Sequence, residues 1–147
     1  MCDSIEIAAA RPDEWSAAFT LALQQVPDAE RPTRVANALT LLGAGEIEPA
    51  GIFVARTPDA LAGVQVCIPL RGSSGLFWLP QVDPSWHDTD LAEQLVQAAL
   101  AWLRMRGAKL AQALVHPGEL ANAAALTRCG FQDITRLQYL RHTLDLV

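Results

Sequence analysis

The sequence predicts a mixed α/β fold, with a central, mostly antiparallel sheet that carries helices on both faces. Three strand-like segments follow one another between residues 51 and 82 and are separated only by turn residues. A strongly amphipathic helix follows over residues 91–106, and one more strand and a short helix come after it. Strands that are joined by turns and interleaved with helices are typical of such layered sandwiches.

The first fifty residues are expected to form one short strand and two helices. Residues 4–9 are the strand candidate, and Pro12 with two following acids then opens a helix. Its apolar residues recur every three or four positions until Pro27 ends the pattern. A second helix is expected to begin near Pro32 and to stop at Gly43.

Three strands are expected next. Residues 51–56 and 63–70 flank a Pro-Asp turn and read as a hairpin, and residues 76–82 read as a third, continuous strand. Because short turns join these segments, we expect antiparallel pairing.

The helix from residue 91 ends at Gly107, after arginines in its last turn. Residues 109–116 are expected to form a strand, and a short helix is expected from about residue 118 to residue 129. Residues 131–146 read as extended chain.

Composition limits the functional classes. A chain of 147 residues is long enough for one domain with a sizeable core. Its net charge of −5 argues against nucleic acid or an anionic membrane as the main partner. No window approaches the roughly 20 apolar residues of a membrane span. The three cysteines are far apart and lack metal-ligand spacing, so we expect reduced thiols in a cytoplasmic protein.

The segments around the long helix resemble the GCN5-related N-acetyltransferases. Val82-Asp83-Pro84 matches the Val-x-Pro that precedes the family's phosphate loop. Residues 115–131 (VHPGELANAAALTRCGF) have the length of the family segment V-N-P-E-N-x-x-A-x-x-L-Y-x-x-x-G-F. The resemblance covers residues 50–147. In the first fifty residues, only the order of helices and strands resembles that of the family. It implies one domain over residues 1–147, with an acceptor side in residues 1–50 and an acetyl-CoA core in residues 51–147.

The resemblance also implies cofactor contacts. Pantetheine would follow the backbone of Pro80, Gln81 and Val82, where this strand and its neighbour at residues 114–116 splay apart. Asn122 is a further candidate contact. The family's phosphate loop Arg-Gly-x-Gly-x-Gly/Ala corresponds to His87, Asp88, Thr89, Asp90, Leu91 and Ala92.

Aspartates in place of the loop glycines oppose phosphate binding. Two like charges ~4 Å apart cost about 1 kcal/mol in water and ~4 kcal/mol at an effective dielectric near 20. We therefore expect acetyl-CoA to be held weakly at its phosphates. Asp90 and Glu93 also have capping-box spacing, which predicts that Asp90 accepts from the free helix amides while Glu93 reaches back. Asp88 is left without an assigned role.

Proton transfer has one candidate. The family often places a tyrosine four residues before its Gly-Phe pair, where this chain has Leu126, and Tyr139 lies elsewhere. His116 is the best replacement because it ends the splayed strand and imidazole titrates near neutrality. The alternative is that His116 only terminates a strand. Arg128 could meet the cofactor's 3′-phosphate or simply face the helix dipole.

Two functions stay open. The first is an N-acetyltransferase that moves an acetyl group from acetyl-CoA to a small-molecule or peptide amine, and we favour it. The second is a catalytically degenerate domain of the same fold with a binding, sensing or assembly role.

Residues 132–147 read as one long strand, which would leave an open sheet edge. We therefore expect a homodimer or a part of a longer chain.

Overall fold

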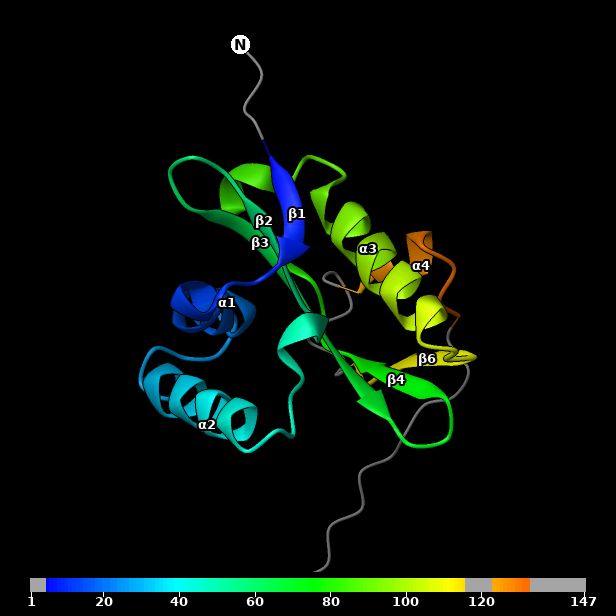
Figure 1. Ribbon diagram of the computed structural model, residues 1–147. Helices are drawn as coiled ribbons and strands as arrows, with labels where there is room; N and C mark the ends of the chain where they lie inside the picture. The colour runs from blue at the N-terminus through cyan, green and yellow to red at the C-terminus, as the bar shows by residue number, and fades with distance from the viewer. Residues whose placement is uncertain (1–4, 116–122, 133–147) are drawn as a thin grey trace, which may run out of the picture.

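The computed structural model describes residues 5–115 and 123–132 (Figure 1). One sheet runs through this part of the chain in the order β1-β2-β3-β4-β6, and β5 pairs with β3 beside that path. Its strands are β1 (Glu6–Ala9), β2 (Ile52–Arg56), β3 (Leu61–Leu70), β4 (Ser74–Phe77), β5 (Gln81–Val82) and β6 (Leu110–Ala113). The β4–β6 pair is parallel, and the other pairs in the described residues are antiparallel.

Helices cover both faces of this sheet, as the sequence predicted (Figure 1). On one face lie α1 (Trp15–Ala22) and α2 (Arg31–Gly43), and on the other lie α3 (Leu91–Met105) and α4 (Ala124–Arg128). The described residues also form three short 3₁₀ helices. They are η1 (Pro12–Glu14) before α1, η2 (Pro49–Gly51) before β2, and η3 (Pro84–Trp86) in the loop before α3. No helix in the described ranges has the length and apolar character needed to cross a membrane.

The central strand β3 is buried on both sides, which divides the core in two. Val64 and Val66 pack with α1 and α2, whereas Cys67 packs with α3 and α4. This follows from strand geometry, because successive side chains point to opposite faces. The α3 layer lies close to the sheet, since a Cβ built on Gly75 would stand 2.5 Å from Leu103 Cδ1.

An ion-pair cluster fastens the N-terminal segment to the sheet. The Arg56 guanidinium in β2 contacts Glu14 Oε1 at 2.6 Å and Oε2 at 2.7 Å, and it contacts Glu6 Oε1 at 2.8 Å. The side chains of Arg56 and Glu14 are 14% and 15% exposed. The hydrogen bonds from Arg56 hold the pKa of Glu14 at about 2.

The first helix is shorter than its apolar pattern predicts. Residues 12–14 form a 3₁₀ turn, and α1 ends at Ala22 although the pattern continues to Pro27. The cause is a turn held by Arg31, whose guanidinium donates to the carbonyls of Leu23, Gln24 and Val26. These carbonyls therefore do not need helical partners.

The third predicted strand is broken. The sequence reads as one strand from residue 76 to residue 82, but the structure divides it into β4 and β5. The other strands and α2 and α3 lie close to the predicted positions.

Candidate functional site

The sheet opens between β5 and the chain that follows β6. Pairing of β4 with β6 ends at Phe77 and Ala113, and among the described strands β5 pairs only with β3. Leu114 and Val115 follow β6 and pair with no described strand, and Leu114 is 65% exposed. In the described residues the strands therefore separate where the family resemblance implied a splay, whose last residue, His116, lies outside the described part of the chain. We call the opening between residues 80–82 and residues 114–115 the strand gap.

A β-bulge produces this separation. Cys67 pairs with Phe77, but Val64 pairs with Gln81. Two residues of β3, 65–66, therefore lie opposite three residues, 78–80, of the segment that joins β4 to β5. An extra residue of this kind bends the strand and increases its twist.

Gln65 closes the bulge from the opposite strand. Its side chain is fully buried, and Nε2 donates to the main-chain oxygens of Trp78 at 2.6 Å and Val66 at 2.9 Å. Where the bulge interrupts the ladder, the Val66 oxygen still accepts from the Trp78 amide at 3.0 Å, and the Gln65 amide supplies a donor for the Trp78 oxygen. Gln65 thereby fixes the point at which β4 gives way to β5.

The backbone of β5 directs one residue toward the strand gap. The amide of Asp83 donates to Ala62 on β3 at 2.8 Å. Because N–H and C=O groups alternate between the two edges of a strand, those of Val82 point away from β3. Pro80 has no N–H. The predicted pantetheine strand thus offers one complete donor and acceptor pair, at Val82.

Gln24 already bonds to the acceptor of that pair, the Val82 main-chain oxygen. Its Nε2 donates to the Val82 main-chain oxygen at 2.9 Å and to Gln81 Oε1 at 2.9 Å. Gln81 is 5% exposed and faces the α1 side. The turn after α1 is therefore bonded directly to β5.

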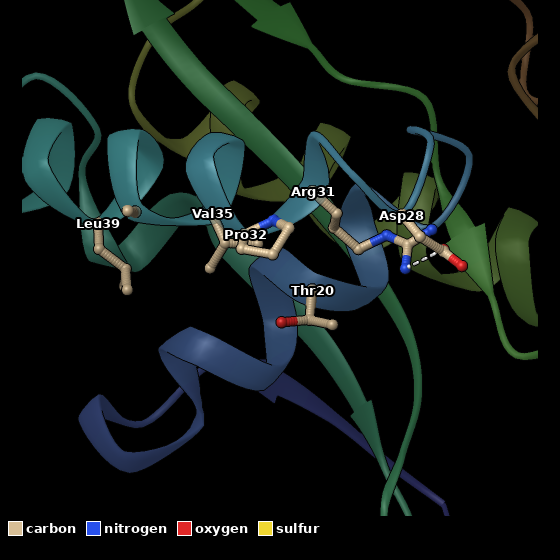
Figure 2. Close-up of a pocket in the computed structure, with 7 residues that line it drawn as sticks. Thr20, Asp28, Arg31, Pro32, Val35 and Leu39 are labelled. Carbon is tan, nitrogen blue, oxygen red and sulfur yellow. Dashed lines mark ion pairs between the residues drawn. The ribbon is translucent and has the colours of Figure 1, made fainter.

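Figure 2 shows Asp28 of this turn and Arg31, the first residue of α2, joined by a 2.8 Å ion pair. They lie at one end of a groove of about 460 Å³ on α1 and α2, which Thr20, Pro32, Val35, Ala36 and Leu39 also line. None of these residues belongs to β4, β5 or β6, so the groove is separate from the strand gap.

An acidic side chain in the loop before α3 accepts hydrogen bonds from within the loop. Asp83 accepts from both the amide and the hydroxyl of Ser85, and the hydroxyl bond lowers the pKa of Asp83. Thr89 Oγ1 donates to the Trp86 carbonyl and accepts from the Leu91 amide at 3.3 Å. Thr89 thus supplies the first acceptor at the start of α3.

The predicted capping box is wrong. Asp90 occupies the N-cap position, but its side chain accepts no helix amide and instead accepts from Gln94 Nε2 at 2.7 Å. Glu93 pairs with Arg128 of α4 at 2.8 Å rather than reaching back to residue 90. The physical reason is that Arg128 offers Glu93 a full charge, which is a stronger partner than a neutral amide.

This correction leaves the start of α3 open. No described residue accepts from the amides of Ala92 and Glu93. His87 and Asp88 are exposed in the loop, and Leu91 is 2% exposed and anchors the helix in the core. Free amides at a helix start favour an anion.

Other predicted site residues fall outside this geometry. His116 and Asn122, together with Tyr139, lie outside the described residues. Leu126, at the family's tyrosine position, is 3% exposed and packs in the α3 core. Arg128 is engaged with Glu93, so an ion pair accounts for it better than the helix dipole alone.

The described cysteines do not form a reactive site. Burial raises the pKa of the Cys67 thiol to about 12 and also raises the pKa of Cys129. Thiols in this state are poor nucleophiles. Within residues 5–115 and 123–132, no group of three or more His, Cys, Asp or Glu side chains is placed to hold a metal ion.

Sequence reasoning missed Gln24 and Gln65. Both are amides whose partners lie on other elements, and neither belongs to a short motif. The one local signal was Pro80 inside an apparent strand, because proline within a sheet marks an edge or a bulge.

No protein-family model matches the sequence, and no curated relative matches it either. Solved structures do match. The aminoglycoside N-acetyltransferase AAC(6')-Iy, solved with coenzyme A, is 16% identical, with a TM-score of 0.77 over 97% of each chain.

Two further structures have similar scores. A predicted acetyltransferase from Clostridium acetobutylicum, solved with acetyl-CoA, is 10% identical, with a TM-score of 0.73 over 94% of this chain and 96% of that chain. A transcriptional regulator from Bacillus halodurans is 13% identical, with a TM-score of 0.71 over 95% of this chain and 100% of that chain. These comparisons confirm the predicted acetyltransferase fold.

Proposed function

We propose that this chain is an N-acetyltransferase that moves an acetyl group from acetyl-CoA to an amine. The observation that carries the proposal is the strand gap, together with the start of α3, where the amides of Ala92 and Glu93 have no acceptor among the described residues. Two structures that share the fold were solved with coenzyme A or acetyl-CoA. An extended arm would pair with the edge of β5 that faces the gap, and the helix start would offer amides for the phosphates at the end of that arm.

The contacts divide between two regions. We assign the pantetheine arm to Pro80, Gln81 and Val82, where the Val82 N–H has no acceptor among the described residues and would donate into the gap. We assign the pyrophosphate to the start of α3, where the contact residues would be His87, Asp88, Thr89, Asp90, Leu91 and Ala92. Asn122 would complete the cofactor contacts from the following segment.

The reaction requires two proton movements. The amine nitrogen attacks the thioester carbonyl carbon, the carbon–sulfur bond breaks, and the sulfur leaves with the electron pair of that bond. The nitrogen loses a proton and the thiolate gains one. The described polar side chains at β5, Gln24 and Gln81, are neutral amides and cannot exchange protons at neutral pH. We therefore assign proton transfer to His116.

A calorimetric titration with acetyl-CoA tests the proposal. Wild-type protein should bind weakly, and Asp88→Gly should bind roughly fivefold tighter or more, because one loop carboxylate no longer opposes the phosphates. Asp59→Gly is the matched control, since it changes the net charge equally in the β2–β3 turn. Tight wild-type binding that Asp88→Gly leaves unchanged would contradict the role of the loop.

Transfer itself is measured by the release of free thiol from acetyl-CoA with a panel of small-molecule and peptide amines. Acetyl-CoA binding without thiol release for any amine would favour the second function, a catalytically degenerate domain that binds, senses or assembles. The observation that favours it is Leu126, which is buried in the core and cannot donate a proton. Sedimentation at several concentrations tests the accompanying proposal of a homodimer.

A further inference from the structure

The amide of Gln24 makes an unusual contact for a turn residue. Both of its Nε2 hydrogens are used, one on the Val82 main-chain oxygen and one on Gln81 Oε1. The orientation of the amide is fixed by chemistry, because a main-chain oxygen can only accept and the group beside it must be a donor. Gln24 therefore places a side-chain N–H where a neighbouring strand would place a main-chain N–H.

The occupied carbonyl is the one that a ligand in the strand gap would need. Residues 80–82 have one complete donor and acceptor pair directed away from β3, at Val82. An extended molecule with amide groups pairs with such an edge as an added strand does. Gln24 blocks the acceptor half of this pairing, and no residue in the described part of the chain accepts from the Val82 N–H.

The side chain of Gln24 can leave without unfolding its turn. Three main-chain carbonyls of the turn, those of Leu23, Gln24 and Val26, are held by the Arg31 guanidinium at 2.7–3.1 Å. These bonds do not involve the Gln24 side chain. Displacing that side chain costs two hydrogen bonds, and the bonds from Arg31 to the turn remain.

We propose that Gln24 is a displaceable cover on the Val82 carbonyl, and that an amide N–H of pantetheine takes its place when coenzyme A binds. This inference rests on the proposed function, because it assigns the ligand of the strand gap to coenzyme A. Gln24 is then an intramolecular competitor of the pantetheine arm. Its release also frees Gln81 Oε1 on the face toward α1.

The test compares coenzyme A binding to wild type, Gln24→Met and the control Gln25→Met by calorimetry. Methionine keeps the unbranched length of glutamine and removes its donors, and Gln25 is an exposed neighbour. Gln24→Met should bind coenzyme A roughly fivefold tighter, because the ligand no longer replaces existing hydrogen bonds. Gln25→Met should match wild type. Adenosine 3′,5′-bisphosphate, which lacks pantetheine, should bind all three proteins equally.

Gln24→Ala is a second variant that also removes both donors, and thermal unfolding checks that each variant is folded. If both folded Gln24 variants bind coenzyme A no more tightly than wild type does, the proposal that Gln24 competes with pantetheine is wrong. The proposed function is then unaffected. Tighter binding of the bisphosphate as well would also overturn it, because the effect would then lie outside the pantetheine arm. If coenzyme A binds to none of the proteins, both proposals fail together.

Discussion

Replacement of Gln65 by glutamate should make the stability of the protein depend strongly on pH. The Gln65 side chain is fully buried, and its Nε2 donates to the oxygens of Trp78 and Val66. A carboxylate cannot donate to either oxygen, so the new carboxyl must keep its proton in the native state. Its folded-state pKa is therefore raised above its value in the unfolded chain.

The magnitude follows from linkage. A carboxyl with a raised folded pKa loses stability as pH rises above the unfolded value of about 4.3, by up to about 1.4 kcal/mol for each pH unit. Between pH 4.3 and pH 7 this amounts to roughly 4 kcal/mol. One of two donors is also lost at every pH, which costs about 1 kcal/mol more. The total at pH 7 is a large share of the roughly 5–15 kcal/mol typical of a domain.

Urea denaturation followed by tryptophan fluorescence at pH 4.5, 5.5 and 6.5 measures this difference from wild type. Gln112→Glu is the matched control, because Gln112 is exposed on β6 and its carboxylate can stay solvated. The control should differ from wild type by a small, pH-independent amount. A Gln65→Glu penalty that does not grow between pH 4.5 and pH 6.5 would refute the role of Gln65 in closing the bulge.

Three other substitutions test the fold and the site. Glu14→Gln should lower the free energy of unfolding by about 2 kcal/mol at pH 7 after solvent screening, because the hydrogen bonds from Arg56 hold the pKa of Glu14 at about 2. This depressed pKa stabilises the fold above pH 4.5, so the difference from wild type should vanish as pH falls from 4.5 to 2 in urea denaturation. Gly75→Ala should cost roughly 1–3 kcal/mol in the same assay, because its Cβ would lie 2.5 Å from Leu103 Cδ1. His116→Ala should lower the rate of thiol release roughly tenfold or more between pH 6 and pH 9.

Each of these has a control in the same chain. Glu30 is exposed, so Glu30→Gln should have little effect, and an equal loss would show that the Glu14 effect is general. Gly43 has no atom within 4 Å of a built Cβ, and Gly43→Ala should be neutral or stabilising. Tyr139→Phe should leave turnover unchanged. Equal rates for wild type and His116→Ala would remove the histidine from the mechanism.

The elements that the sequence predicts well are those with a clear local period. The β2–β3 hairpin has two strand-like runs around a short turn, and α3 has a stripe of apolar residues with a glycine stop. In both cases neighbouring residues decide the structure. The strand gap was predicted only through resemblance, because pairing between β4 and β6 joins segments more than thirty residues apart.

The break between β4 and β5 illustrates what local patterns miss. Residues 76–82 are almost continuously apolar, which is equally compatible with a straight buried strand. The bulge depends on the Gln65 amide, which reaches Trp78 from the neighbouring strand. The capping box failed for the same reason, because Glu93 pairs with Arg128, thirty-five residues away.

The corrected loop also sharpens the choice between the two functions. Asp83 is bonded to Ser85, Asp90 to Gln94, and Glu93 is neutralised by Arg128. Asp88 is the loop carboxylate without a partner among the described side chains, so at the proposed cofactor site it would oppose the phosphates with the least compensation.

Removal of Asp88 therefore separates phosphate affinity from chemistry. If weak binding alone limits an active enzyme, Asp88→Gly should raise the rate of thiol release at low acetyl-CoA concentration and leave the saturated rate unchanged. In a degenerate domain, Asp88→Gly should tighten binding without producing turnover, because the charge of the loop does not supply the proton that the leaving thiolate needs. A Val82 N–H in the gap and open amides on α3 would then serve a domain that binds coenzyme A and does not use it.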